Sequence, residues 1–392
     1  MVLKNLTLKK MIKSKFLTLL ILFFSSNLLA SPNIDAKTGI LLDFNSSEVI
    51  YEQDPDTHIY PASMTKIMTS IIAFDLLKKN QLKLDDEILV SENAWRMSKK
   101  GFSSMFIMLN DKVTVEDLLR GIIVVSGNDA CVALAEGIAG TEENFVEMMN
   151  EKSEEIGLTN TSFANSSGIN HPQNYSTVRD IAIMSQYLIK NFPDYYDYFK
   201  ELDFTWDRTG GDPIKQGNRN PLLYKKIGAD GIKTGYLDSE KYSLAASVVG
   251  DKRRLISVVS GFKTKQARSN QSLRLISWGL RNTNTYQIAE KNSPLFNFNV
   301  WLGKKNAVLG YVKEDLFVTI KKNEIKDLKL TLNYTGPIKA PVKKDQKIGQ
   351  LVIKRKNSKD LLVSVYSSED IKKINFIKSL FLSFNYMIWG DV

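Results

Sequence analysis

Residues 61–70 read PASMTKIMTS, and this stretch carries the first strong structural signal in the chain. Pro61 closes the preceding loop, and apolar side chains then recur at helical spacing, which predicts a mostly buried helix over residues 66–79. The apolar positions are Ile67, Met68, Ile71, Ile72 and Leu76. Because residues three apart share a helical face, we expect the side chains of Ser63 and Lys66 to lie within reach of each other.

Two interpretations of this serine and lysine pair stay open on this stretch alone. A lysine beside a serine hydroxyl in a dry place can lose its proton and act as the base that activates the hydroxyl. Alternatively, Ser63 caps the N-terminus of the helix and Lys66 is a solvated charge in its first turn. The rest of the chain has to distinguish them.

Strand-like and helical segments follow a definite order between residue 36 and about residue 285. Two hairpins are predicted, one from TGILLDF and EVIYEQ, residues 38–53, and one from KYSLAASVVG and RRLISVVSGF, residues 241–262. This order predicts an α+β domain in which both ends form one antiparallel sheet that helices cover. The predicted helices lie between the hairpins, at residues 66–79, 115–124, 129–139, 143–156 and 177–190.

The pattern changes at about residue 290. The segments LFVTI, LKLTLNY, QLVIKRK and LLVSVYS alternate apolar and polar residues and are separated by Pro, Gly, Asn and Asp, which is typical of strands joined by turns. A small all-β domain is therefore predicted after the helix-and-sheet domain. The length of 392 residues also favours two domains, and contents of 43% apolar and 10% aromatic residues argue against disorder.

The first thirty residues have the composition of a secretory signal peptide. Five lysines precede the apolar run FLTLLILFF, and small residues follow up to Ala30, which predicts cleavage after Ala30. The run is short for a membrane span, and an uncleaved N-terminal anchor is the alternative. Without residues 1–30 the formal net charge falls from +10 to +5. This excess suits a surface of anionic lipid or wall polymer, and a secreted chain is not expected to bind nucleic acid.

The cysteine and histidine content argues against disulfide and metal chemistry. Cys131 is the only cysteine and lies in the apolar segment DACVALAEGIAG, so it is predicted to be a small buried side chain. The two histidines, His58 and His171, are far apart and show no metal-ligand pattern. No nucleotide-binding glycine motif occurs. We therefore expect neither a metal nor a cofactor.

Two further motifs accompany the serine and lysine pair. VVSGNDA places Ser126 and Asn128 at a break between two helical segments, and DGIKTGY places Lys233, Thr234 and Gly235 before the last hairpin. The order S-x-x-K, S-x-N, K-T-G, with gaps of 63 and 107 residues, is the pattern of penicillin-binding proteins and class A β-lactamases. Each motif alone is weak, but the ordered set is specific.

Segments around these motifs extend the likeness. The chain resembles the serine-type D-alanyl-D-alanine carboxypeptidases, the low-molecular-mass penicillin-binding proteins of the peptidase S11 family, over nearly all residues after the first thirty. The resemblance implies a penicillin-binding, β-lactamase-like transpeptidase fold, with a catalytic domain at residues 31–285 and a small β-rich domain at residues 286–368. Besides the three motifs it rests on GFSSMFI, GNDACVALAE, GLTNTSFANSSG, YSTVRD, GNRNPLL, GIKTGY, RRLISVVSG and VWLGKK, in family order.

The resemblance implies that four side chains carry out acyl transfer. Ser63 is the expected nucleophile. Lys66, buried near Lys233, has its ammonium form disfavoured by desolvation and by the like charge, so it can take the serine proton. Ser126 is expected to relay a proton to the leaving amine, and Asn128 offers an amide that holds Lys66 and the substrate peptide group.

A second set of groups is expected to bind the substrate. Lys233 supplies a positive charge for a substrate carboxylate, Thr234 supplies a hydroxyl, and Gly235 lets the strand backbone approach closely. The backbone amides of Ser63 and Tyr236 occupy the oxyanion positions of the family.

Two arginines are further candidates for binding the substrate. Arg219 lies in GNRNPLL and Arg268 in KTKQARSNQS, and either can grip the terminal carboxylate of the substrate. An exposed or structural arginine is the alternative for each.

Two positions depart from the family pattern. Ser167 precedes Gly168 where a histidine is common, and Glu240 and Lys241 precede Tyr242 where small residues are usual. Both changes are expected near the cleft. They leave the nucleophile intact and bear on the rate of deacylation and on substrate detail.

The resemblance implies a serine carboxypeptidase that removes the terminal D-alanine from peptidoglycan stem pentapeptides and that binds β-lactams. Two alternatives remain. A β-lactamase on the same fold needs a well-placed glutamate for rapid deacylation, and EIGLTN comes near the lactamase E-x-x-L-N pattern, with Thr159 in place of the asparagine. A non-catalytic wall-binding scaffold usually lacks the serine or a lysine, whereas all three motifs are complete here.

The last segment, residues 369–392, is predicted to be an amphipathic helix that lies on a membrane. Its apolar side chains fall on one side of a helical projection and its polar side chains on the other. The apolar stretch from Ile374 to Trp389 is only 16 residues long and contains Lys378, so a membrane span is disfavoured. We therefore expect an enzyme held at the periplasmic face of the inner membrane, with a helix packed in a protein core as the alternative.

Overall fold

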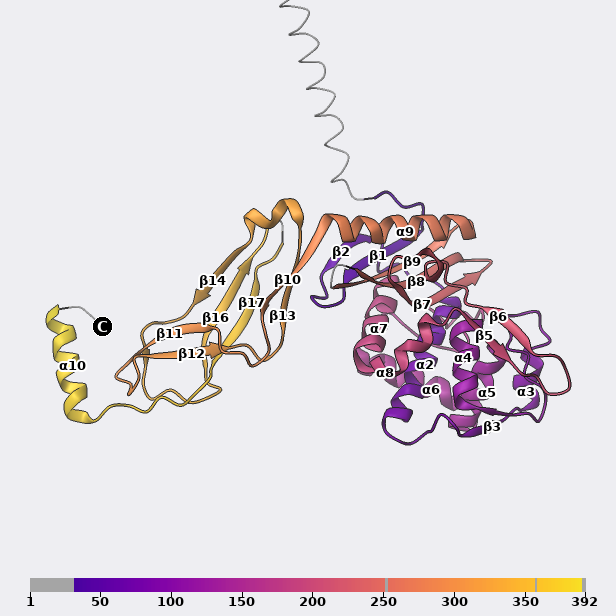
Figure 1. Ribbon diagram of the computed structural model, residues 1–392, viewed down its shortest axis with the longest axis horizontal. Helices are drawn as coiled ribbons and strands as arrows, with labels where there is room; N and C mark the ends of the chain where they lie inside the picture. Colours follow the sequence, from indigo (N-terminus) through magenta and orange to yellow (C-terminus); the bar gives the residue numbers. More distant parts are fainter. Residues whose placement is uncertain (1–31, 251–252, 357, 390–392) are drawn as a thin grey trace, which may run out of the picture. The chain divides into compact units, whose positions relative to one another are not determined.

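The structure is a computed structural model that describes residues 32–250, 253–356 and 358–389. Two compact units are present (Figure 1). One contains Val49–Asn282 and the stretch that ends at Phe44, and the other contains Asn45–Glu48 and the residues from Thr283 onward. The predicted signal peptide, residues 1–30, lies outside the described residues.

The first unit is built on a five-stranded antiparallel sheet. Its strands are β1 (Thr38–Asp43), β2 (Val49–Gln53), β7 (Ala229–Leu237), β8 (Lys241–Gly250) and β9 (Arg253–Phe262). The order is β2-β1-β9-β8-β7. Both predicted hairpins are confirmed, because β1 pairs with β2 and β8 pairs with β9. β1 also pairs with β9, with Gly39 opposite Val259, so the two ends of the unit meet in one sheet as predicted.

Helices cover both faces of this sheet. They are α2 (Lys66–Lys78), α3 (Glu92–Met97), α4 (Val115–Arg120), α5 (Asn128–Ala139), α6 (Glu142–Ile156), α7 (Val178–Asn191), α8 (Pro193–Tyr196) and α9 (Lys265–Asn282). Figure 1 shows α9 along one face and the others on the opposite side. Side chains of a strand alternate between faces. Ile40 and Leu42 therefore join the core with α2 and α7, whereas Leu41 joins a second core with Leu275 of α9.

Hydroxyl side chains begin four of these helices. Each accepts a hydrogen bond from the main-chain N–H three residues later and so satisfies a donor that has no partner inside the helix. The capping residues are Ser91 for α3, Thr114 for α4, Thr141 for α6 and Thr177 for α7.

The predicted helices are all present, with ends that differ by a few residues from the predicted ones. The helix α9 and two small hairpins were not among the predicted elements. One hairpin pairs β3 (Glu87–Leu89) with β4 (Lys112–Thr114), and the other pairs β5 (Asp203–Trp206) with β6 (Ile214–Gly217).

The second unit is a β-structure, as predicted. Its strands are β10 (Thr283–Ala289), β11 (Phe296–Trp301), β12 (Ala307–Tyr311), β13 (Leu316–Lys321), β14 (Lys329–Asn333), β15 (Ile338–Lys339), β16 (Lys347–Lys354) and β17 (Leu361–Ser367). Six strands form a sheet of order β14-β16-β17-β12-β11-β15, and β10 pairs with β13. Alternate side chains such as Phe298, Ile353 and Val365 form its core.

The predicted C-terminal amphipathic segment contains the helix α10 (Phe376–Trp389). The residues before it belong to the β-structure, because Ile371 pairs with Val342 and the Ile374 N–H donates to the Leu302 carbonyl. Throughout the described ranges, the helices are too short or too polar to cross a membrane.

Candidate active site

The stretch PASMTKIMTS forms a 3-10 turn, η2 (Ala62–Thr65), that leads directly into α2. Ser63 lies within this turn, and its side chain does not cap α2, whose N-cap residue is Thr65. Lys66 is the first residue of α2 and is only 1% exposed. The interpretation of this pair as a helix cap and a solvated charge is therefore wrong.

Lys66 lies at the centre of a hydrogen-bonded cluster. Its Nζ donates to Ser63 Oγ at 3.1 Å, to Asn128 Oδ1 at 2.7 Å and to the main-chain oxygen of Ser167 at 2.5 Å. Three acceptors match the three hydrogens of an ammonium group. A neutral amine keeps two of these contacts and has a lone pair available for the Ser63 hydroxyl proton.

The electrostatics of the site favour neutral lysines. Burial lowers the pKa of Lys66, and the charge of Arg219 lowers it further, while the carboxylates of Asp129 and Glu142 raise it. Burial also lowers the pKa of Lys233 well below its ordinary range, with a further decrease from the positive charge of Lys66. Burial thus disfavours the ammonium form of both lysines, and Lys66 disfavours that of Lys233 further; a lowered pKa is the condition for a lysine to act as a base.

Ser126 follows the π-helical turn η3 (Gly121–Val125) and precedes α5. Its backbone is left-handed, with φ of 68°, a region that non-glycine residues rarely occupy outside functional sites. Ser126 Oγ accepts a hydrogen bond from Lys233 Nζ at 2.9 Å. The break between the two helices therefore presents Ser126 to the second lysine and Asn128 to the first.

Asp129 is a functional candidate that the sequence reasoning missed. It is fully buried, and its carboxylate accepts hydrogen bonds from the Ser104 hydroxyl and from the main-chain N–H groups of residues 105–107. These contacts hold the segment that carries Ser103 into the cavity wall. The available signal was an acidic residue directly after Asn128.

The K-T-G motif lies on β7, at the edge of the sheet. Lys233 and Thr234 are buried. Gly235 lies against the turn that carries Ser63, and a Cβ at this position would come within 3.0 Å of the Pro61 oxygen. Glycine allows this approach because it has no side chain.

A cavity of about 930 Å³ unites these groups. Lys66 and Lys233 join it through their hydrogen bonds to Ser63 and Ser126. The structure thus brings all ten predicted residues to one site. Those that line the wall are Ser63, Ser126, Asn128, Arg219, Thr234, Gly235, Tyr236 and Arg268, and the wall also contains Phe102, Ser103, Asp238, Tyr242 and Lys265, which were not predicted.

Arg268 and Arg219 add positive charge to this wall. Arg268 is 8% exposed, and burial lowers its pKa to about 10. Its guanidinium lies 5.8 Å from the centre of the Tyr242 ring, and its Nη2 donates to the Arg219 carbonyl at 3.4 Å. Arg219 is exposed and donates to Ser103 Oγ. An anionic ligand would find a buried cation here that has no carboxylate partner among the described residues.

The two departures from the family pattern have different locations. Ser167 is buried and lines the cavity. Glu240 is also buried, but it pairs with Lys37 at 3.4 Å and accepts hydrogen bonds from the Tyr60 N–H and the Ser260 hydroxyl. Glu240 therefore joins strands beside the cleft and is not part of the cavity wall.

Metal-binding side chains do not gather in the described part of the chain, where no group of three or more His, Cys, Asp or Glu could hold an ion. His58 stacks on the Tyr175 ring with centroids 4.7 Å apart. Cys131 is fully buried, and burial raises the pKa of its thiol to about 12. It is the small buried side chain that its apolar segment predicted.

Comparisons with known proteins agree with this geometry. A family profile described as D-alanyl-D-alanine carboxypeptidase, Peptidase S11, matches residues 26–264, and one described as penicillin-binding protein 5, C-terminal domain, matches residues 284–373. The chain is 38% identical over 334 residues to D-alanyl-D-alanine carboxypeptidase DacC of Escherichia coli, covering 84% of this chain and 82% of that protein. It is 40% identical to DacA of Haemophilus influenzae, covering 82% and 81%.

The fold is likewise that of a solved relative. Penicillin-binding protein 5 from Haemophilus influenzae superposes with a TM-score of 0.81 at 38% identity, covering 88% of this chain and 99% of that one. The helix-covered antiparallel sheet and its cavity of serine and lysine side chains define a serine-type peptidase. The chain belongs to the D-alanyl-D-alanine carboxypeptidase family, Peptidase S11.

Proposed function

We propose that this enzyme removes the terminal D-alanine from peptidoglycan stem pentapeptides through an acyl-enzyme on Ser63. The observation that carries the proposal is the contact of Ser63 Oγ with Lys66 Nζ at 3.1 Å. Lys66 is buried and its pKa is lowered by that burial. A serine next to such a lysine, on the wall of a cavity, has its general base in place.

The first half-reaction transfers the acyl group to the serine. Lys66, as a neutral amine, takes the Ser63 proton, and the Ser63 oxygen attacks the carbonyl carbon of the penultimate D-alanine. The ester C–O bond forms and the peptide C–N bond breaks, and the leaving nitrogen receives a proton through Ser126. The main-chain N–H groups of Ser63 and Tyr236 are the donors assigned to the developing oxyanion. Water then attacks the ester carbonyl, which restores Ser63 and releases the shortened stem.

The carboxylate of the terminal D-alanine is assigned to the basic side of the cavity. Lys233, Thr234, Arg219 and Arg268 lie there, and the wall holds one carboxylate, Asp238, within the described residues. A bound carboxylate would stabilise the ammonium form of Lys233 and offset its desolvation. The cavity therefore favours a substrate with a free C-terminus.

The alternatives receive less support. The wall contains no glutamate among the described residues, and Glu155 of the lactamase-like segment EIGLTN pairs instead with Lys152 at 2.6 Å. Rapid lactamase deacylation would need a free carboxylate beside the ester, and Asp238, the carboxylate of the described wall, accepts a hydrogen bond from the Tyr236 hydroxyl at 2.6 Å. A non-catalytic scaffold has no use for a buried lysine with a lowered pKa, which costs stability.

Release of D-alanine from a peptide ending in D-Ala-D-Ala, measured with the purified protein without residues 1–30, tests this function. We expect turnover of this peptide and no turnover of its L-Ala-L-Ala counterpart. Rapid hydrolysis of penicillin without peptide turnover would instead indicate a β-lactamase, and binding of the peptide without turnover would indicate a scaffold.

We further propose that β-lactams acylate Ser63. Penicillin-binding protein D2 of Listeria monocytogenes, solved in a cefotaxime-bound form, superposes with a TM-score of 0.58 at 25% identity, covering 64% of this chain and 99% of that one. The β-lactam carboxylate would occupy the same basic side of the cavity as the substrate carboxylate.

The proposed location is the periplasmic face of the inner membrane, reached after removal of residues 1–30. α10 supports this location because its apolar side chains point away from the protein. Phe376, Phe381 and Met387 are 77%, 70% and 77% exposed, whereas Ser379 is buried. Tyr386 packs on Trp301 with ring centroids 5.3 Å apart. The alternative of a helix packed in a protein core by its apolar face does not fit this orientation.

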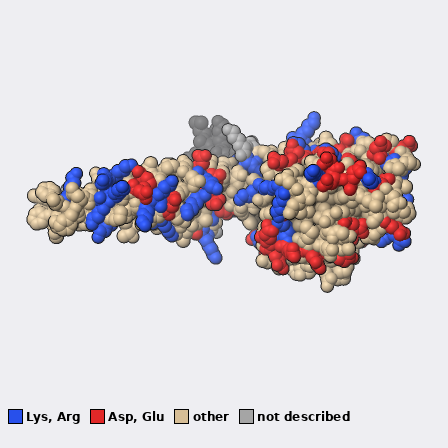
Figure 2. Space-filling model, turned by 90° about the horizontal axis from the view of Figure 1, so that it is seen from below, with Lys and Arg blue, Asp and Glu red and all other residues tan. Residues whose placement is uncertain are grey.

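Lysines near the start of α10 support the same proposal. Figure 2 shows Lys and Arg side chains spread over the second unit. Just before α10 lie Lys372 and Lys373, and Lys304 lies on the segment that pairs with theirs. All three lysines are exposed, and the structure gives them no ion pair in its described part. Lysines beside an exposed apolar helix can contact anionic headgroups while the helix lies in the interface.

Deletion of residues 375–392 is expected to release an active enzyme from membranes. The cut spares Ile371 and Ile374, which hold the β-structure. Sedimentation with membranes measures the loss of binding, and D-alanine release measures retained activity. The double variant Phe381→Ser, Met387→Ser should weaken binding, whereas Ser383→Ala on the polar side should not. If the truncated protein still sediments, the anchor lies elsewhere, with an uncleaved N-terminal segment as the first suspect.

A further inference from the structure

The main-chain oxygen that holds Lys66 belongs to a long loop. This loop, residues 157–177, joins α6 to α7 and carries Ser167, whose carbonyl accepts the 2.5 Å hydrogen bond from Lys66 Nζ. A carbonyl can orient a side chain only if the peptide to which the carbonyl belongs is itself held in place. The contacts that hold this loop are therefore part of the geometry of the catalytic lysine.

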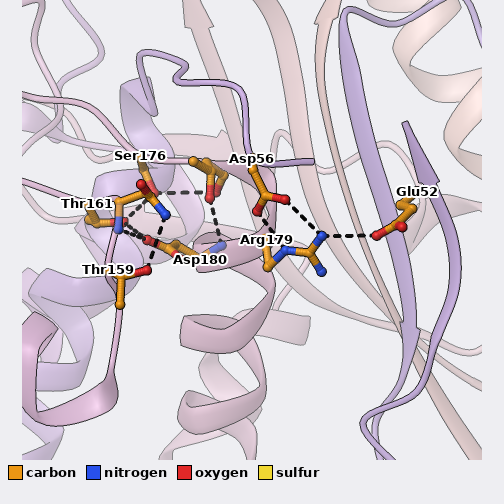
Figure 3. Close-up of polar contacts among 9 residues, drawn as sticks. Glu52, Asp56, Thr159, Thr161, Ser176, Arg179 and Asp180 are labelled. Atoms are coloured by element: carbon orange, nitrogen blue, oxygen red, sulfur yellow. Dashed lines mark hydrogen bonds and ion pairs between the residues drawn. The ribbon is translucent and has the colours of Figure 1, made fainter. Parts of the chain in front are cut away.

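The ends of the loop are fastened at the start of α7 (Figure 3). Asp180 accepts a hydrogen bond from the Thr161 hydroxyl at 2.8 Å, and Thr161 Oγ1 lies 2.8 Å from Ser176 Oγ. The neighbouring Arg179 donates to Asp56 at 2.7 Å, which ties the same turn to the segment before Ser63. Both ends of the loop are thus fixed independently of the active site.

The middle of the loop is held from α6. Glu142, a half-buried residue in the first turn of α6, accepts on Oε1 both the N–H of Ser166 at 2.9 Å and its hydroxyl at 2.5 Å. The Ser166 carbonyl then accepts from the Thr69 hydroxyl at 2.5 Å. The next carbonyl along the chain is that of Ser167, the partner of Lys66. Two successive carbonyls of this segment therefore face α2, and Ser166, the residue that carries the first, is held through its N–H and its hydroxyl by one carboxylate.

The next residue of the loop contacts the turn that bears the nucleophile. Gly168 has φ of +79°, and a Cβ there would lie 1.8 Å from the Ala62 oxygen. Asn165 Oδ1 accepts from the N–H groups of Gly168 and Ile169 at 2.7 and 3.0 Å. With the loop in such close contact with the turn, a small displacement of its middle would move the Ser167 carbonyl relative to Lys66.

We propose that Glu142 is a positioning residue for acylation: by holding the N–H and the hydroxyl of Ser166, it keeps the Ser167 carbonyl on Lys66 Nζ. The inference rests on the proposed roles of Ser63 and Lys66. Nothing in the sequence motifs points to Glu142, which lies 76 positions beyond Lys66. The proposal concerns an acid that does not line the cavity wall.

The charge of Glu142 has a predictable effect on the pH profile. The titratable groups that act on Lys66 from the surrounding elements are Asp129, Cys131, Glu142 and Arg219, and Lys66 itself lowers the pKa of the neighbouring Lys233. The Glu142 carboxylate raises the pKa of Lys66. Removal of this charge lowers that pKa, so neutral Lys66 persists to more acidic pH. The acid limb of the acylation rate should therefore move to lower pH.

The experiment measures the single-turnover acylation rate with a labelled penicillin between acid and neutral pH for four proteins. They are the wild type, Glu142→Ala, Glu142→Gln and the matched control Glu143→Gln, an exposed neighbour on α6. Glu142→Ala loses both hydrogen bonds, and we expect a rate about 10-fold lower at its plateau. Glu142→Gln keeps an acceptor oxygen, so its plateau should be close to that of the wild type while its acid limb moves to lower pH. Glu143→Gln should match the wild type.

Each outcome decides the proposal. The proposal is supported if Glu142→Gln has a plateau acylation rate close to that of the wild type and an acid limb of the pH profile at lower pH. A merely structural role would leave the acid limb where it is in the wild type. An Ala variant that reacts like Glu143→Gln overturns it, as does an equal loss in the Ala and Gln variants with an unmoved limb. A wild type that penicillin does not label at Ser63 would refute the proposed function itself, and that result is distinct from either outcome.

Discussion

Ser63→Ala is expected to abolish labelling by penicillin and to reduce D-alanine release by about 10⁴-fold or more, the scale at which removal of a catalytic nucleophile acts. In the proposed mechanism the Ser63 oxygen forms the ester, and the cavity wall offers no second hydroxyl with a direct contact to Lys66 Nζ in the described structure. Ser126 accepts from Lys233 Nζ instead and lacks the 3.1 Å contact to Lys66 Nζ that Ser63 has. The label in the wild type should be found on the peptide that contains Ser63.

Ser70→Ala is a suitable control for this variant. Ser70 is buried one turn further along α2, and its hydroxyl donates only to the Lys66 carbonyl, at 2.8 Å. Its loss removes a serine from the same helix without touching the cluster at Lys66 Nζ. We expect penicillin to label Ser70→Ala as it labels the wild type. The thermal unfolding midpoint of both variants shows whether each is folded. Labelling that persists in Ser63→Ala, at Ser126 or elsewhere, would contradict the proposed mechanism.

Lys233→Ala is expected to lower kcat/KM for the D-Ala-D-Ala peptide by about 100-fold or more, which corresponds to about 3 kcal/mol of transition-state stabilisation. Lys233 is buried, and burial and the charge of Lys66 lower its pKa well below its ordinary range. A substrate carboxylate in the cavity raises that pKa again, so the enzyme gains a cation when the substrate binds. The alanine variant lacks this response and also leaves Ser126 without its 2.9 Å partner.

A peptide with an amidated C-terminus separates the two roles of Lys233. Without a carboxylate, the wild type loses the electrostatic part of its advantage, and the ratio of wild-type to variant kcat/KM should shrink. Lys265→Ala is the matched control, because Lys265 lies on the same wall and is exposed. It should lose far less activity, since a solvated charge contributes little. An equal ratio for the free and the amidated peptide would show that Lys233 acts through Ser126 alone.

Much of the fold could be predicted from local pattern. The helix at residues 66–78 follows from apolar spacing after Pro61, and the hairpins at both ends of the first unit follow from alternating strands around short turns. These patterns are strong because burial on one face leaves a regular period in the sequence. The helix α9 was missed although it buries Leu275 and Ile276, because its sequence, KQARSNQSLRLISWGLRN, is largely polar at its start.

The site could be predicted only where a motif marks it. All ten predicted residues lie together, because each motif presents a side chain at a fixed offset from a turn or a strand edge. Some of the missed groups, such as Tyr242 and Lys265, line the cavity wall, and three others belong to the main chain or hold it in place. The Ser167 carbonyl reaches Lys66 across 101 positions, and a carbonyl is the same in every residue. Asp129 and Glu142 act by holding peptides, which no residue-type pattern reveals.

The sequence by itself determined which chemical groups are available and in which order, since the motifs at Ser63, Ser126 and Lys233 need only short-range geometry. It also determined the strand and helix types, since side-chain periodicity depends on neighbours along the chain. Only the tertiary structure decided that Lys66 is a buried lysine with a lowered pKa and not a solvated charge. The reason is physical, because the pKa of a lysine depends on its exposure to water and on the charges around it. The partners and charges that act on the Lys66 ammonium group from beyond its own turn belong to residues 62 or more positions away, which the packing of α2 against its neighbours brings near.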